Sequence, residues 1–78
     1  MHVAANVRRH RQSRGLTQEA LAAMAVLESR YIQRIEASDA NPTVIVLAAL
    51  AAALEVDVRD LFEPVEPEPR RVGRPSAS

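Results

Sequence analysis

The sequence predicts an all-α fold, a single small domain of five short helices, and three observations lead to this prediction. Apolar residues recur at helical spacing, as Leu27, Tyr31, Ile32 and Ile35 do. Glycine, proline and helix-capping residues divide the chain at short intervals, and no internal repeat or alternating β pattern is present. Because a chain of 78 residues removes only about 60% of its unfolded surface from water, a partner subunit is also expected.

The first two helices are expected over 3–14 and 18–24. Gly15 follows the first helix and suits the left-handed conformation in which many helices end. Thr17 is the N-cap candidate of the second helix, because its hydroxyl oxygen can accept a hydrogen bond from a free backbone N–H. A short connection around Gly15 therefore joins the two helices.

The third and fourth helices are expected over 28–37 and 44–54. A turn at 25–27 leads into the third helix. The polar stretch "ASDANP" ends it, and either Asn41 or Thr43 caps the fourth helix. The second and third helices, with the turn between them, form a helix-turn-helix candidate.

A one-turn fifth helix is expected to begin at Asp57 and to end near Phe62, because Asp57 and Asp60 have the spacing of a capping box. The composition then changes, with four prolines and little aliphatic bulk over 63–78. Such a segment cannot bury enough apolar area to offset its ordering entropy, so a disordered tail is predicted. The expected domain is therefore 1–62.

Composition argues against an enzyme. There is no cysteine, which excludes disulfides, thiolate metal sites and a cysteine nucleophile. The two histidines, His2 and His10, do not belong to a ligand-spaced cluster with carboxylates. No catalytic motif or glycine-rich phosphate loop is present. We therefore expect no catalytic residue, no metal and no cofactor.

Nothing in the sequence indicates a membrane protein. The most apolar run, 44–54, is 11 residues long, whereas a membrane-spanning helix needs about 20. The N-terminus has no apolar segment after its basic residues, so no signal peptide is expected. The chain is therefore predicted to be cytoplasmic.

The charge is unevenly distributed although the net charge is zero. Residues 1–34 hold six arginines and two glutamates, a balance of +4. Residues 35–69 hold one arginine and eight acidic residues, a balance of −7, and 70–78 add three arginines. A basic half beside an acidic half indicates an oriented electrostatic surface, of the kind that attracts nucleic acid.

Four segments in order, "GLTQEALA", "YIQRIE", "NPT" and "LAAALEVDVRDLF", resemble the lambda-repressor/Cro-like (XRE) helix-turn-helix family over residues 3–62. The short form and the spacing of "YIQRIE" and "NPT" are similar to restriction–modification controller proteins, while antitoxins and phage repressors share much of the pattern. The resemblance implies a bacterial transcriptional regulator that binds double-stranded DNA, with the helix over 28–37 in the major groove.

The polar side of the helix over 28–37 supplies the residues expected to contact bases, which are Ser29, Arg30, Gln33 and Arg34. Arg30 and Arg34 are one turn apart, and a bidentate arginine is the commonest side chain for recognising guanine. The alternative is that this side of the helix is an ordinary solvated surface that contacts no DNA. Contacts to the DNA backbone are expected from residues around this helix and from the first helix, namely Thr17, Gln18, Arg8, Arg14, Ser38 and Asn41. Gln18 matches the family's backbone-clamping glutamine.

The resemblance also implies one structural ion pair, between Arg11 and Glu36, which ties the first helix to the end of the third. Three positions depart from the family pattern. Val26 and Glu55 stand where the family has glycine, and a β-branched residue is strained at positive φ. His10 occupies a core aliphatic position, where a half-buried histidine with one hydrogen bond is expected.

The run over 44–54 is apolar all round, although a helix packed on one side would have a polar outer face. Val44, Leu47, Leu50, Ala51 and Leu54 are assigned to the core. The remaining residues predict a two-fold homodimer interface, made of Ile45, Val46, Ala49, Ala52, Val58, Leu61 and Phe62. Exposed methyl groups without a function are the alternative.

A rival hypothesis is that the fold is a protein-interaction module. In that case the apolar surface of the helix over 44–54 binds another protein, such as a toxin or RNA polymerase, and the helix over 28–37 is plain surface. In the tail, "RRVGRP" resembles an AT-hook, whose Gly-Arg-Pro core lies in the minor groove, and a plain disordered end is the alternative.

Overall fold

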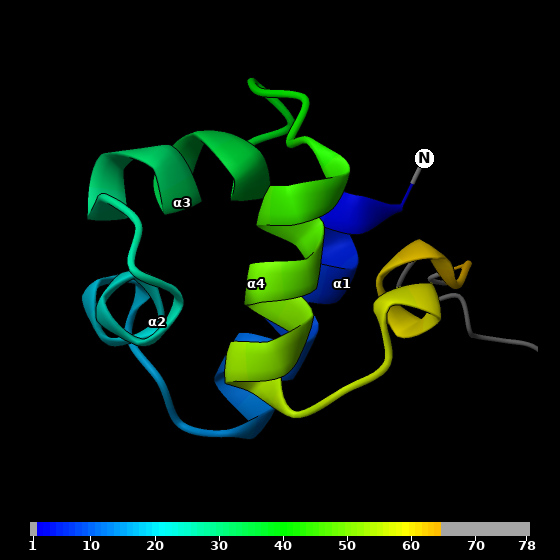
Figure 1. Cartoon of the computed structure of the whole chain (residues 1–78), viewed down its shortest axis with the longest axis horizontal. Helices are drawn as coiled ribbons and strands as arrows, with labels where there is room; N and C mark the ends of the chain where they lie inside the picture. The colour runs from blue at the N-terminus through cyan, green and yellow to red at the C-terminus, as the bar shows by residue number, and fades with distance from the viewer. Residues whose placement is uncertain (1, 65–78) are drawn as a thin grey trace, which may run out of the picture.

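The computed structural model describes residues 2–64, which form a bundle of four α-helices and one 3-10 helix (Figure 1). The elements are α1 (Val3–Ser13), α2 (Gln18–Ala25), α3 (Ser29–Glu36), α4 (Val44–Leu54) and η1 (Val58–Phe62). The all-helical prediction is confirmed for this part of the chain, where no strand occurs, but the fifth helix is a 3-10 helix. Most of the predicted tail, with its "RRVGRP" motif, lies outside the described residues.

Threonine side chains cap the starts of α2 and α4. The Thr17 hydroxyl accepts a hydrogen bond from Ala20 N at 2.9 Å, which confirms the predicted N-cap of α2. The Thr43 hydroxyl accepts from Val46 N at 3.3 Å, so Thr43 rather than Asn41 caps α4. Each of these contacts satisfies one of the backbone donors that a helix start leaves free.

The core lies where α4 packs between α2 and η1, with α1 behind it (Figure 1). Aliphatic side chains from every element meet there, and the most completely buried of them are Val7, Leu21, Ile32, Ile35, Leu50, Leu54 and Leu61. One polar side chain, that of Asn6, is also fully buried. Its amide donates to Leu61 O at 3.0 Å and to Glu63 O at 2.7 Å, so it joins α1 to the end of η1.

Two apolar assignments made from the sequence are wrong. Leu61, predicted at a dimer interface, is 0% exposed because η1 turns it inward against α1 and α4. Val44, assigned to the core, is 76% exposed because the first turn of α4 does not bury it. The outward surface of α4 therefore includes Val44, and η1 contributes Phe62 without Leu61.

Three residues other than glycine adopt left-handed backbone conformations in the described chain, each at the end of an α-helix. Val26 ends α2 with φ 59° and ψ 48°, and Glu55 ends α4 with φ 60° and ψ 42°. Ser38 follows α3 with φ 59°. The turn before α3 thus keeps a left-handed residue although a β-branched valine occupies it, and this conformation costs about 1–2 kcal/mol in an L-residue.

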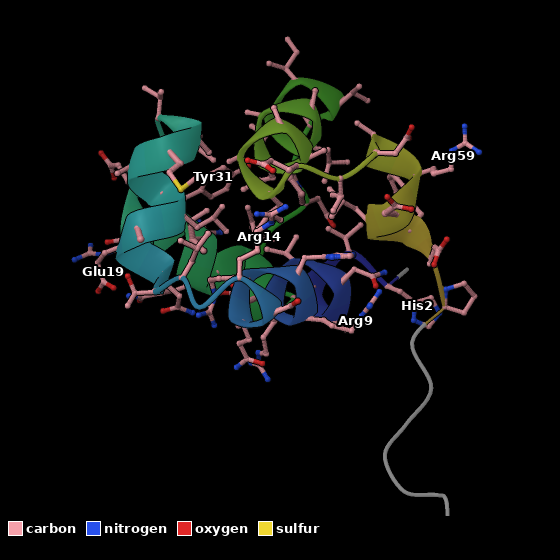
Figure 2. All side chains as sticks on the ribbon, turned by 90° about the horizontal axis from the view of Figure 1, so that it is seen from below. His2, Arg9, Arg14, Glu19, Tyr31 and Arg59 are labelled. Atoms are coloured by element: carbon pink, nitrogen blue, oxygen red, sulfur yellow. The ribbon has the colours of Figure 1, made fainter. Side chains whose placement is uncertain are left out.

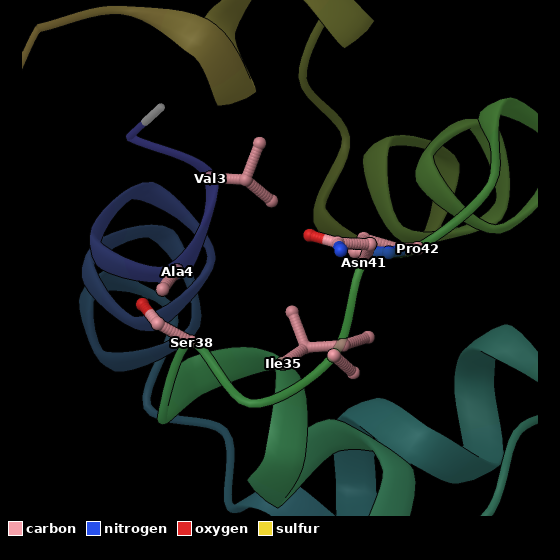
Figure 3. Close-up of a pocket in the computed structure, with 7 residues that line it drawn as sticks. Val3, Ala4, Ile35, Ser38, Asn41 and Pro42 are labelled. Carbon is pink, nitrogen blue, oxygen red and sulfur yellow. The ribbon is translucent and has the colours of Figure 1, made fainter.

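The loop between α3 and α4 rests on the start of α1. A small hollow lies between them, lined by Val3, Ile35 and Pro42 among others (Figure 3). Ser38 and Asn41 also line it, and Figure 3 shows Ser38 beside the first turn of α1. This packing fixes the direction in which the loop leaves α3.

Candidate nucleic-acid interface

Helix α3 presents one apolar and one polar side. Ile32 and Ile35 are buried against the bundle, whereas Arg30, Gln33 and Arg34 are exposed and Ser29 is half-buried. The four residues predicted to contact bases therefore lie on the outward side of a helix that the core holds in place. An α-helix with its side chains is about 10–12 Å across, which the major groove of DNA can admit.

The C-terminal end of α3 is anchored to α1 by Arg11 and Glu36, which the structure brings together. Arg11 Nε donates to Glu36 Oε2 at 2.7 Å, and Arg11 Nη2 donates to Glu36 Oε1 at 3.0 Å. The Glu36 side chain is 1% exposed and the Arg11 side chain 12%. The hydrogen bond with Glu36 raises the pKa of Arg11, an effect that burial partly opposes, so the guanidinium stays charged.

Gln18, at the first position of α2, joins the same buried carboxylate. Its Nε2 donates to Glu36 Oε1 at 3.1 Å, and Arg8 Nε lies 3.8 Å from that oxygen. Gln18 is half-buried, while the Arg8 side chain is 57% exposed. The Glu36 carboxylate at the end of α3 thus lies close to two residues predicted to contact the DNA backbone. The sequence did not indicate the contact between Gln18 and Glu36, because the two residues are far apart along the chain.

Arg14, which was also predicted to contact the DNA backbone, lies at the C-terminal end of α4. Its Nε donates to Leu54 O at 2.6 Å, and its Nη2 donates to Glu55 Oε1 at 3.1 Å, so it caps the C-terminal end of α4. Figure 2 shows Arg14 reaching from α1 toward α4. The predicted phosphate contact of Arg14 is not favoured, because a helix C-terminus already engages the guanidinium. Arg9 is also engaged, since its Nη2 donates to Asn6 Oδ1 at 2.8 Å.

The other residues predicted to contact the DNA backbone lie at the two ends of the helix-turn-helix. Thr17 is exposed directly before α2, where its hydroxyl caps the helix. Ser38 and Asn41 are exposed in the loop that follows α3. Gln18 and Arg8 contact Glu36 at the C-terminal end of α3, and Ser38 and Asn41 follow that same end in the chain.

The outer side of α4 is apolar and uncovered. We define the α4 outer face as Val44, Ile45, Ala48, Ala49 and Ala52, of which Ile45 is 82% exposed. It continues into an open groove beside α2, lined by Met24, Val26 and Ala53 among others. On the other side of α4, Phe62 is 44% exposed, whereas Val46 and Val58 pack partly against the core.

His10 is half-buried on α1, as the sequence indicated. Its Nε2 is buried and has no hydrogen-bond partner. Among residues 2–64 no group of histidine and acidic side chains is placed to hold a metal ion. In the same part of the chain, no helix has the length and apolar character that crossing a bilayer requires.

Comparison with known proteins gives one consistent family. A helix-turn-helix family model matches residues 7–61. An uncharacterized HTH-type transcriptional regulator of Sinorhizobium fredii, y4dJ, is 39% identical over 67 residues, which is 86% of this chain and 87% of the relative.

Solved structures show the same fold. The restriction–modification controller protein C.AhdI of Aeromonas hydrophila superposes with a TM-score of 0.76 at 31% identity, over 78% of this chain and 92% of that one. The DNA-binding domain of the P22 C2 repressor superposes with a TM-score of 0.76 at 26% identity, over 80% of this chain and 82% of that one. The hypothetical transcription factor NHTF from Neisseria has a TM-score of 0.77 at 32% identity, over 80% and 70% of the two chains.

Proposed function

Because this chain belongs to the helix-turn-helix family of DNA-binding transcriptional regulators, we propose that it binds a palindromic operator as a homodimer and inserts α3 into the major groove. The activity proposed is binding without chemistry. Occupancy of an operator would exclude RNA polymerase from a promoter or recruit it. The cell compartment that fits this activity is the bacterial cytoplasm, at the nucleoid.

The observation that carries the proposal is the exposed polar side of α3. Arg30 and Arg34 are one turn apart on the outward side of a helix whose apolar side is buried. A guanidinium can donate two hydrogen bonds to guanine O6 and N7, and the side-chain amide of Gln33 can pair with adenine in the same way. Arg11 and Glu36 hold the C-terminal end of α3 against α1, so the helix backbone that carries these donors has a fixed position.

Contacts to phosphates would set the register of the helix on the DNA. Gln18 lies at the start of α2, and its amide group has a second hydrogen that the contact with Glu36 does not use. Arg8, mostly exposed beside it, adds a positive charge. Thr17 before α2, and Ser38 and Asn41 after α3, offer exposed short polar side chains. Such contacts position the protein without carrying sequence information.

A second copy of the chain is the proposed occupant of the α4 outer face. Two-fold pairing through Ile45, Ala49 and Ala52, with Phe62 at the edge, would bury side chains that water otherwise surrounds. Pairing of this kind would place two copies of α3 about 34 Å apart, which is one turn of DNA. Of the interface predicted from the sequence, this pairing keeps Ile45, Ala49, Ala52 and Phe62. Leu61 is buried, and Val46 and Val58 pack partly against the core.

Binding to DNA is tested by enriching duplexes from a randomised library with the full chain, then measuring affinity for an enriched duplex and for a random duplex at several salt concentrations. We expect a preference for the enriched duplex and an affinity that falls steeply as salt rises. Arg30→Ala should reduce the preference at one base pair, by about 1–3 kcal/mol. Arg59→Ala is the matched control, because Arg59 is 82% exposed on η1. Equal affinity for both duplexes would refute sequence-specific binding.

Sedimentation of the wild-type protein and of Ile45→Asp tests the dimer. We expect a dimer that becomes a monomer when a carboxylate is placed in the centre of the α4 outer face. Ala23→Asp is the control, because Ala23 is exposed on α2 and lies outside that face. A wild-type monomer, or a dimer that Ile45→Asp leaves intact, would refute this interface. A wild-type monomer would favour the rival hypothesis, in which the face binds a different protein.

A further inference from the structure

The end of α3 is closed by a loop whose backbone returns to the helix. Asp39 N donates to Arg34 O at 2.7 Å, and Ser38 N donates to Ile35 O at 3.0 Å. Together with the left-handed Ser38, these two bonds form the Schellman arrangement that ends many helices. The arrangement holds Asp39 directly beside the side chain of Arg34, at the edge of the surface proposed to contact bases.

Asp39 contacts one particular edge of the Arg34 guanidinium. Arg34 Nη2 donates to Asp39 O at 3.0 Å, and Arg34 Nε lies 3.9 Å from Asp39 Oδ2. Both nitrogens belong to the side-on edge of the guanidinium, which is formed by Nε and Nη2. The end-on edge, formed by Nη1 and the second hydrogen of Nη2, is left for another acceptor pair. The Arg34 side chain is 55% exposed, so that edge is accessible.

We propose that Asp39 is a positioning residue for Arg34, which it holds so that the end-on edge of the guanidinium meets the O6 and N7 atoms of one guanine. This inference rests on the proposed function, since it names what fixes the base preference of the same helix. A free arginine side chain has many rotamers and loses that freedom when it binds. A side chain already held by Asp39 loses less on binding, and it is kept away from the neighbouring phosphates.

The charge of Asp39 makes this role distinguishable from that of an ordinary surface carboxylate. Its side chain is 78% exposed, near the place where a DNA backbone would pass. A carboxylate there weakens the attraction of any DNA, whatever its sequence. Removing the charge from an ordinary surface carboxylate would raise specific and random affinity by the same factor. Removing it from a positioning residue must also lower the ratio between them.

The experiment measures the affinity of the full chain for an enriched duplex and for a random duplex of the same length. The variants are Asp39→Asn, Arg34→Ala, both together, and Glu28→Gln. Glu28 is the matched control, an exposed acidic residue at the N-cap of α3 whose side chain makes no capping hydrogen bond. Thermal unfolding checks that each variant folds, which is expected of Asp39→Asn because its backbone contacts remain.

For Glu28→Gln we expect both affinities to rise together. For Asp39→Asn we expect random affinity to rise and the ratio of specific to random affinity to fall about two- to fivefold, because the carboxylate contact at 3.9 Å is lost while the hydrogen bond to Asp39 O remains. Enrichment repeated with Asp39→Asn should show relaxed preference at the same base pair that Arg34→Ala relaxes. In the Arg34→Ala background, Asp39→Asn should leave the ratio unchanged.

An unchanged ratio for Asp39→Asn would overturn the inference and leave the proposed function intact. So would an equal fall of the ratio in the Arg34→Ala background, because the effect would then not act through Arg34. If the wild-type protein enriches no sequence at all, the proposed function fails, and this inference fails with it.

Discussion

Replacing Arg11 with methionine tests how strongly the end of α3 depends on a buried ion pair. The substitution removes both hydrogen bonds to Glu36, at 2.7 and 3.0 Å, together with the bond from Arg11 Nη1 to Leu16 O at 2.8 Å. Methionine keeps a long unbranched side chain in the same space. What changes is therefore the charge and its hydrogen bonds, and the Glu36 carboxylate stays buried with a net negative charge.

The expected cost follows from that burial. Removing one partner of a buried ion pair costs about 3–5 kcal/mol. Gln18 at 3.1 Å and Arg8 at 3.8 Å still face the carboxylate, which places the cost near the lower end of that range. The Leu16 carbonyl loses a donor, at a cost of about 1 kcal/mol. A chain of 78 residues has a total stability of about 4–12 kcal/mol, so a loss of about 3–4 kcal/mol would remove between about a quarter and all of it.

Urea unfolding followed by circular dichroism measures the cost, at one protein concentration for all variants because dimerisation would add to the stability. The informative comparison is the double variant Arg11→Met with Glu36→Met, which leaves no buried charge. Replacing both partners of a buried pair with apolar residues is often neutral. We therefore expect the double variant to regain at least half of the loss.

Two results would refute this reasoning. A cost below about 1 kcal/mol for Arg11→Met would mean that the pair behaves like a surface ion pair despite its burial. A double variant no more stable than the single variant would mean that packing of the arginine, rather than the charge left on Glu36, accounts for the loss.

Three further predictions concern other parts of the fold. Arg14→Ala should lower stability by about 1–2 kcal/mol in urea unfolding, because Leu54 O loses a charged donor at 2.6 Å. The salt dependence of DNA binding should stay unchanged in this variant. A shallower salt dependence would show that Arg14 does contact a phosphate, as predicted from the sequence. Val26→Gly should raise stability by about 1 kcal/mol, since glycine adopts φ 59° without strain, whereas a loss would mean that the left-handed turn is not strained by valine. The hydrogen bond from Arg59 N lowers the pKa of Asp57 in the folded state below its ordinary value of 3.8. The stabilising effect of this hydrogen bond is therefore complete above pH 3.8 and is lost as the pH falls below that value. Asp57→Ala should lower the urea midpoint at pH 7, and its midpoint should decrease less on acidification than that of the wild type. Parallel pH profiles of the two proteins would contradict this role.

Much of the fold could be predicted because its determinants are local. Thr17 caps α2 through a contact three residues ahead, and Asp57 and Asp60 cap η1 within a single turn. Gly15 adopts φ 68° directly after α1, as its position in the sequence suggested. Interactions between residues three or four positions apart depend on the order of the side chains along the chain, so they can be predicted from the sequence alone.

The roles of the arginines could not be assigned in this way. Arg11 and Arg14 lie three residues apart on α1, and nothing in their immediate neighbours separates them. Arg11 meets Glu36 at the end of α3, and Arg14 meets the carbonyl of Leu54 at the end of α4. The resemblance to a family suggested the first contact, but only the packing of α4 against α1 revealed the second.

The same limit applies to the apolar residues of η1. Leu61 and Phe62 are neighbours of similar character, yet one is fully buried and the other is 44% exposed, because the direction of a single 3-10 turn decides between them. The sequence by itself determined the helices, the caps of α2 and η1, and the polar side of α3. The tertiary structure decided which side chains reach across to other elements, as Arg14 reaches Leu54 O, because those contacts depend on how helices distant in the sequence pack together.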